Sequence, residues 1–274
     1  MAIGGNPVFN SKSFRSQTQP GSAGPGTTLA YPGQQADMSP QQLQDLYTQR
    51  SAGPAETGRM TYADVINKTV FSFGLLLVGA YVGWQLPGLM LPAVLIGLVL
   101  GLVNSFKKEP SPALILLYAA VEGVFIGGLS GVLESMYPGI AVQAVAATLS
   151  VFAVTLVLYR SGKYRATPKM TKMFMIAMIG YLVFSLVNFG MMMFGAIEGM
   201  FGMRSGWFGL AIGALAVLLA TYALVLDFTS IEQGVRNGAP EKYSWTAAFG
   251  LTVTMVWLYV EILRIIAIIR EMSQ

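Results

Sequence analysis

The 274-residue chain contains no cysteine and no histidine, and only 11% of its residues are charged. The absence of cysteine excludes disulfides and thiol chemistry. The absence of histidine excludes the Ser-His and Cys-His pairs of hydrolases and the H-E-x-x-H zinc motif. A soluble domain carries about 25% charged residues. This chain therefore has too few charges to cover a water-facing surface of ordinary extent.

Apolar residues are in excess instead: 54% of the chain is hydrophobic, and the mean hydropathy is +0.59. Crossing a bilayer takes about 20 apolar residues, and runs of that length recur from Val70 onward. We expect spans at about 68–86, 89–106, 112–133, 139–159, 172–194, 207–228 and 245–270. Strand-like alternation is not evident. The predicted fold class is therefore an all-α membrane protein, with a seven-helix transmembrane domain over 61–274.

Residues 1–60 differ from the rest because they are rich in Gly, Pro, Ser, Gln and Thr. This composition is typical of a disordered segment. The long apolar stretch of a signal peptide is missing from it. We expect a disordered cytoplasmic tail, with a short helix over 39–47 that begins with Ser39 as N-cap and Pro40 in its first turn.

The placement of lysine and arginine predicts the orientation. Of the 17 basic residues, fourteen lie before the first span or in the loops after the second, fourth and sixth spans. The loops on the other side hold only Arg204, while Arg264 and Arg270 belong to the last span. Basic residues concentrate in cytoplasmic loops, so we expect the N-terminus in the cytoplasm and the C-terminus outside. The basic loops are interpreted as topology determinants, not as nucleic-acid sites.

Ionisable residues inside a bilayer are costly and are functional candidates by default. Glu122 lies in the third span, Asp227 at the end of the sixth, and Glu261 and Arg264 three residues apart on one face of the seventh. Three acids and one base are candidates to line a cation or proton path. Each also has a structural explanation: Asp227 facing water, Glu261 and Arg264 as an ion pair, and Glu122 as a protonated hydrogen-bond donor.

One short motif suggests an enzyme. The sequence Gly128-Leu129-Ser130-Gly131 matches the G-x-S-G around the nucleophile of rhomboid intramembrane proteases, but that serine needs a histidine base. We interpret Gly123, Gly127, Gly128 and Gly131 as small residues that allow close helix packing. With no cofactor motif either, we expect a protein that is not an enzyme and uses no cofactor.

Two segments together resemble a known family. They are ALVLDFT at 223–229 and WLYVEILR at 257–264, supported by 111–123 at the start of the third span. They are similar to the transmembrane Bax-inhibitor-motif family, which has an acidic residue in its sixth helix and an L-Y-x-[DE]-I-like motif in its seventh. The segments 6–9 and 60–66 look like its actinobacterial branch. The resemblance covers residues 60–274.

The resemblance implies a bundle around a central seventh helix in a bacterial plasma membrane, acting as a pH-sensitive calcium leak. In the family, a carboxylate pair between the last two helices shares a proton and acts as the sensor. The matching residues are Asp227 and Glu261, which are then also the candidate calcium ligands. Calcium, or another cation, would be the transported ion.

The resemblance also suggests partners for this gate. A basic residue at the cytoplasmic end of the second helix corresponds to Lys108, or less directly to Lys107, and Arg264 is a further candidate. Glu122 is a candidate path acid. The chain departs from the family in having Glu261 where Asp is usual and lysine where arginine is usual, which loses bidentate geometry.

The depth of Glu261 in the last span argues against direct contact between the carboxylates of Glu261 and Asp227. At 1.5 Å per residue from Ser244, Glu261 would lie about 25 Å into the last span, far from Asp227. That span is also longer than a core of about 30 Å requires. We therefore expect helix tilt or a vestibule. The alternative function is a non-transporting regulator that binds another membrane protein, such as a quality-control protease, through the long tail.

Overall fold

The computed structural model describes residues 58–162, 164–197 and 199–273. Over these ranges the helices are joined by short loops, and the strand-like pairing among the described residues is limited to an isolated antiparallel bridge between Arg59 and Pro240. The elements in order are α3 (Tyr62–Gln85), η3 (Pro87–Leu89), α4 (Met90–Phe106), α5 (Pro112–Met136), α6 (Ile140–Arg160), α7 (Pro168–Met193), η4 (Gly202–Arg204), α8 (Gly206–Arg236) and α9 (Tyr243–Met272). The helix expected over 39–47 lies outside the described residues.

Seven segments of the described chain are long and apolar enough to cross a membrane, with η3 and α4 counted as one. This confirms the predicted all-helical, seven-span fold class. Two helices run well past the predicted spans at their polar ends. α3 begins at Tyr62, whereas the span was expected from about 68, and α8 continues to Arg236 instead of ending near 228. Hydropathy marks only the apolar part of a helix, so polar end turns are missed.

Turn chemistry sets the helix boundaries. Thr61 caps α3 by accepting a hydrogen bond from the backbone N–H of Asp64 at 3.1 Å. Pro112 and Pro168 occupy the first positions of α5 and α7, where the missing N–H has no helical partner to lose. Gly139 has φ +85°, a backbone conformation that permits the tight turn before α6.

α3 and α5 pack with their backbones in direct contact. At Gly79, Gly83, Gly123 and Gly127, an added Cβ would lie 1.9 to 2.1 Å from a backbone carbonyl oxygen of the other helix. Only glycine fits at that separation, as in other membrane helix pairs. The prediction that Gly123 and Gly127 serve packing is confirmed. We call these four residues the glycine interface.

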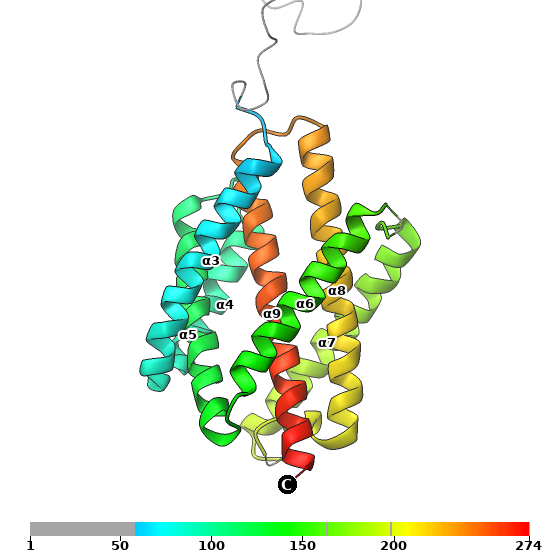
Figure 1. The fold of residues 1–274 in the computed structure, drawn as a ribbon. Coiled ribbons are helices and arrows are strands. Elements are labelled where there is room, and N and C mark those ends of the chain that lie inside the picture. Colours follow the sequence, from blue (N-terminus) through cyan, green and yellow to red (C-terminus); the bar gives the residue numbers. More distant parts are fainter. Residues whose placement is uncertain (1–57, 163, 198, 274) are drawn as a thin grey trace, which may run out of the picture. The chain divides into compact units, whose positions relative to one another are not determined.

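The last helix is the centre of the bundle. Of the apolar stretch of α9, 67% is buried, against 6 to 44% for the other six spans. α9 contacts α3, α5, α6 and α8, and Figure 1 shows it, in orange and red, running between α3 and α8. Buried polar residues on it include Thr252, Thr254, Glu261 and Arg264. The expected central seventh helix is confirmed.

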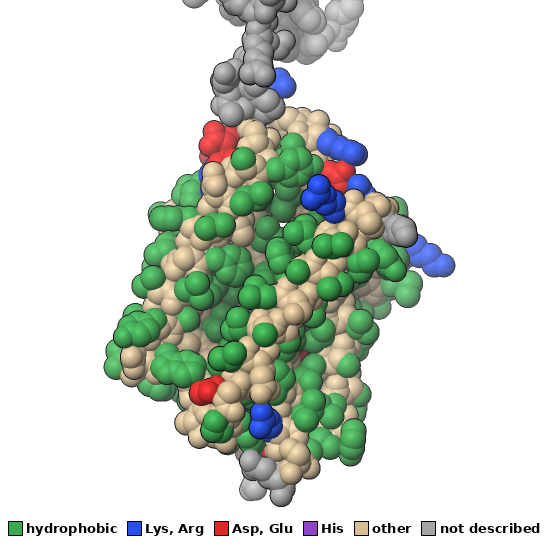
Figure 2. Space-filling model, in the orientation of Figure 1, with side chains coloured by type: hydrophobic (Ala, Val, Ile, Leu, Met, Phe, Trp, Pro, Cys, Tyr) green, Lys and Arg blue, Asp and Glu red, His purple; other side chains and the backbone are tan. Residues whose placement is uncertain are grey.

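One end of the bundle is basic. At the end where α3 begins and α8 finishes, the loops and the adjoining helix ends hold most of the described lysines and arginines, and Figure 2 shows basic side chains gathered there above an apolar band. We call this the basic end. The last residues of the predicted tail are ordered here: the N–H of Met60 donates to the carbonyl of Ala239 at 2.7 Å, and that of Glu241 to the carbonyl of Gly58 at 2.9 Å. The packed domain therefore begins by residue 58.

Candidate functional site

Asp227 lies between α8 and α9. It is nine residues from the end of α8, about 13 Å from the basic end along the axis. The hydroxyl of Thr254 on α9 donates to Asp227 Oδ2 at 2.7 Å. One turn earlier on α9, Gly250 leaves space for the carboxylate, because an added Cβ there would lie 3.3 Å from Asp227 Oδ1. Asp227 is thus half-buried at a helix interface, with a neutral hydrogen-bond partner.

Glu261 occupies a different environment. Its side chain is 3% exposed, and its carboxylate accepts hydrogen bonds from the Tyr181 hydroxyl on α7 and from Arg264 on its own helix. Arg204 Nη1 lies 3.8 Å from Glu261 Oε1. A single carboxylate therefore connects α7, α9 and the segment that precedes α8. We call Tyr181, Arg204, Glu261 and Arg264 the inner cluster.

Arg204 reaches this cluster because the α7–α8 connection folds inward. The Asn188 side chain, buried on α7, accepts a hydrogen bond from the backbone N–H of Met203 at 2.7 Å. The Arg204 guanidinium then lies 4.8 Å from the centre of the Tyr181 ring and donates to Ser185. Its side chain is only 16% exposed. From the sequence alone this arginine is expected in an outer loop.

The inner cluster carries an excess positive charge. It contains two guanidinium groups and one carboxylate, with exposed fractions of 16% and 6% for the arginine side chains. Arg204 Nε and Arg264 Nε and Nη1 are buried without a hydrogen-bond partner among the described residues. Buried charges are tolerated only when they are paired. Glu261 is therefore the group on which the placement of both arginines depends.

A second cluster of the same composition lies at the basic end. Glu232 on α8 accepts hydrogen bonds from the Tyr159 hydroxyl and from Arg165, and Arg236 Nη2 lies 3.0 Å from Glu232 Oε1. The arginine side chains are 44% and 71% exposed. We call these four residues the basic-end cluster. This cluster is not predicted from the sequence, although the four-residue spacing of Glu232 and Arg236 is typical of an ion pair on one helix face.

The structure does not bring Asp227 and Glu261 together. Thr254, the partner of Asp227, precedes Glu261 by seven residues, which is about 10 Å along α9. Calcium binds oxygen ligands at about 2.3–2.6 Å, so in this arrangement the two carboxylates share neither an ion nor a proton. The described part of the chain contains no group of three or more Asp, Glu, His or Cys residues able to hold a metal ion.

The remaining predicted site residues lie apart from the inner cluster. Glu122 is partly buried on α5, and its carboxylate packs against Gly97 of α4, where an added Cβ would lie 2.8 Å from Oε2. Lys107 and Lys108 are exposed in the loop after α4. Neither lysine takes part in an ion pair with the residues that the structure describes.

Ser130 of the G-x-S-G motif is a packing residue in this structure. It is buried, its hydroxyl donates to the carbonyl of Ile126 at 2.6 Å, and it lies 2.7 Å from the Tyr259 hydroxyl. The contact with Tyr259 connects α5 with α9. These bonds fit the interpretation of this motif as a close helix contact.

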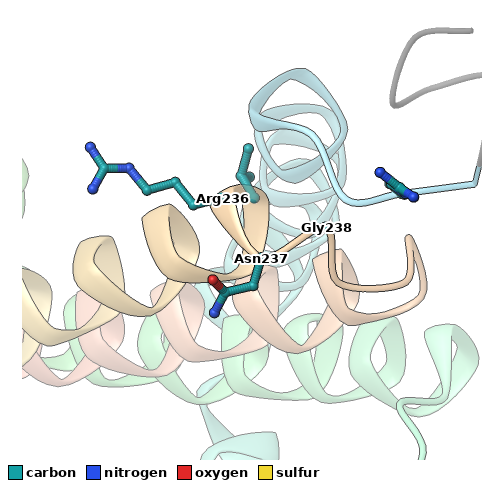
Figure 3. A pocket seen from close by; sticks show the side chains of 5 residues that line it. Arg236, Asn237 and Gly238 are labelled. Carbon is teal, nitrogen blue, oxygen red and sulfur yellow. The ribbon is translucent and has the colours of Figure 1, made fainter.

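A small hollow of about 250 Å³ lies at the end of α8, lined by Arg59, Val235, Arg236, Asn237 and Gly238. Figure 3 shows the Arg236 and Asn237 side chains pointing in different directions. The polar groups therefore do not converge on one point, as they would around a bound ligand. This hollow is not the candidate site.

The fold and the inner cluster define a class: a multi-pass membrane protein whose central helix carries buried, paired charges. A family model described as Bax inhibitor 1 like matches residues 6–271, nearly the whole chain. The chain belongs to the Bax inhibitor 1-like family. No curated protein sequence matches it.

Proposed function

We propose that this protein is a pH-sensitive cation leak of the bacterial plasma membrane, with calcium as the ion. The supporting observation is that the most buried helix, α9, is also the one that carries Glu261 and Arg264. Ionisable groups within the membrane thickness face the bundle interior and mark ion or proton pathways. The bias of basic residues supports a cytoplasmic basic end and an outer C-terminus.

In this proposal the inner cluster is the closed gate. Ionised Glu261 attracts both Arg204 and Arg264 and so holds α7, α9 and the start of α8 together. Protonation of Glu261 removes the negative charge, and the two arginines then repel each other. Acidification therefore favours separation of these elements and opening of the route along α9.

Asp227 has the separate role of a path carboxylate. Its one hydrogen-bond partner in the described chain, Thr254, is neutral, so its remaining lone pairs stay free for a hard cation. Glu122 is a second path acid by the same reasoning. A gating role for Lys108 stays a prediction without a contact to support it. The proposal involves no enzymatic step and no cofactor.

The test is calcium flux in proteoliposomes, scanned over pH. Glu261→Gln mimics the protonated state, so its flux at neutral pH should rise to the acid level of the wild type and lose its pH dependence. Asp227→Asn should lower flux while keeping the shape of the pH profile. The double variant Asp227→Asn with Glu261→Gln should show both effects, because the two sites do not touch.

A second variant separates the loss of the gate carboxylate from a loss of folding caused by unpaired buried charge. Glu261→Gln combined with Arg264→Gln removes the carboxylate while keeping the cluster's net charge at +1, and it should also lose the pH dependence. Unchanged pH-dependent flux in every Glu261 variant would contradict the gate. Absence of flux from the wild type at any pH would favour the non-transporting regulator, and a chain lacking residues 1–57 should then lose its partner.

A further inference from the structure

A groove runs between α3 and α6, with α9 as its floor. It consists of two hollows, of about 820 and 640 Å³. Four residues line both hollows: Phe73, Leu77, Leu149 and Met255. Because they share these walls, the hollows are two halves of one groove.

The groove matches the hydrocarbon interior of a bilayer in length and chemistry. Its α3 wall runs from Tyr62 to Gln85, about 35 Å, which is close to the thickness of a bilayer's hydrocarbon core. The walls are apolar and open to the side, with Leu77 66% and Leu149 55% exposed. Figure 2 shows hydrophobic side chains along both walls. In a membrane such an opening faces acyl chains.

The two ends of the groove differ in charge. The half at the basic end is bordered by Arg165 and Glu232. The other half ends at Tyr81, Trp84 and Gln85, and its lining contains no charged residue. Glu232 pairs with Arg165, which borders the groove, and also with Arg236, which is not part of the groove lining, so two guanidinium groups share one carboxylate at this end of the protein. The excess charge there is positive.

We propose that the basic-end half of the groove binds an anionic glycerophospholipid. The phosphate contacts Arg165, whose side chain is 44% exposed, and an acyl chain lies between α3 and α6 over Met255. Guanidinium groups match phosphate geometry through paired N–H donors. The other half of the groove contains no such group and selects no headgroup. This binding does not depend on whether the protein conducts ions.

Native mass spectrometry of the full chain in detergent tests the headgroup contact, with phosphatidylglycerol and phosphatidylcholine as probes. The wild type should bind phosphatidylglycerol more tightly. Arg165→Gln should weaken that binding about tenfold, the effect of one charge-assisted hydrogen bond, and leave phosphatidylcholine unchanged. Arg160→Gln is the matched control, because Arg160 is exposed at the end of α6, shortly before the loop that carries Arg165, and does not line the groove.

A second pair of variants tests the acyl-chain position. Leu149→Trp fills the groove where its halves meet and should reduce binding of both lipids. Val157→Trp, two turns along α6 and outside the groove lining, should bind both as the wild type does. Equal affinity of the wild type for the two lipids, or wild-type phosphatidylglycerol binding by both Arg165→Gln and Leu149→Trp, would overturn the proposal.

Discussion

The inner cluster and the basic-end cluster are built from the same side chains. Each has a glutamate that accepts a hydrogen bond from a tyrosine and is flanked by two arginines. In each, one arginine also lies over the tyrosine ring, at 4.9 Å for Arg165 on Tyr159 and 4.8 Å for Arg204 on Tyr181. Composition alone therefore does not distinguish them.

Hydration does distinguish them. Arginine side chains in the basic-end cluster are 44% and 71% exposed, whereas those in the inner cluster are 16% and 6% exposed. Exposed pairs are screened by water and salt and contribute little. Buried charges lose their hydration and become dependent on each other. The same set of one tyrosine, one glutamate and two arginines is thus a partly hydrated contact at one place and a structural necessity at the other.

The two clusters should differ most in the stability that is lost when the glutamate of each is removed. Glu261→Gln leaves two buried guanidinium groups without a counter-charge, so the free energy of unfolding should fall by about 3 kcal/mol. Adding Arg264→Gln should recover part of the loss, because one unpaired charge is then gone. Denaturant titration in detergent measures both. If Glu261→Gln lost no more stability than Glu232→Gln does, burial would not distinguish the two clusters.

Removing the tyrosine hydroxyl should also cost more stability in the inner cluster than in the basic-end cluster, although both losses should be smaller. Tyr181→Phe removes a hydrogen bond to a buried carboxylate and should cost about 1.5 kcal/mol. Tyr159→Phe should cost less, because water near the exposed Arg165 replaces the hydroxyl. Thermal melting of the two variants side by side measures the difference. Equal costs would show that water does not reach Glu232.

Removing Glu232, the glutamate of the basic-end cluster, should affect stability less than removing Glu261. Glu232→Gln should reduce the free energy of unfolding by less than about 1 kcal/mol, the range for ion pairs with exposed partners. At about 1 M salt, where charges are screened within a few ångströms, the effect should shrink further. The Glu261→Gln effect should persist at the same salt concentration, since its surroundings exclude water and ions.

The pair of Lys242 and Glu109, in which both side chains are exposed, should give the smallest effect and sets the baseline. Lys242 donates a hydrogen bond to Glu109 at 2.8 Å and lowers the pKa of that carboxyl below its ordinary value of 4.5. A lowered pKa contributes stability above pH 4.5, and this is lost as pH falls through the folded-state value. Glu109→Gln should therefore melt slightly below the wild type at pH 7, and the gap should close in acid. A gap that widens in acid would reverse the assigned sign.

Sequence predicted the spans because each needs about 20 apolar residues, a local property of the chain. It also predicted the central role of α9, since Glu261 and Arg264 are too costly to face lipid. It missed the polar end turns of α3 and α8, which hydropathy does not register. Such turns are fixed by caps and by packing against neighbouring loops.

The sequence identified Glu261 as a candidate site residue but did not predict which side chains surround it. Glu261 was identified, yet its partners Tyr181 and Arg204 are separated from it by long stretches of chain and follow no recognisable spacing. Arg204 appeared to be an ordinary loop residue, and only the anchoring by Asn188 turns it inward. Contacts of this kind depend on how helices pack, which a single sequence does not state.

The glycine interface has a consequence for how this bundle can move. At four positions the obstacle to a larger residue is the backbone of the facing helix, which has no rotamer to change. Sliding α3 along α5 would drive carbonyl groups into these same contacts. The two helices are therefore expected to behave as one rigid body during any rearrangement. Conformational freedom is left to the helices on the other side of the groove, α6, α7 and α8, which pack around α9 without such a lock.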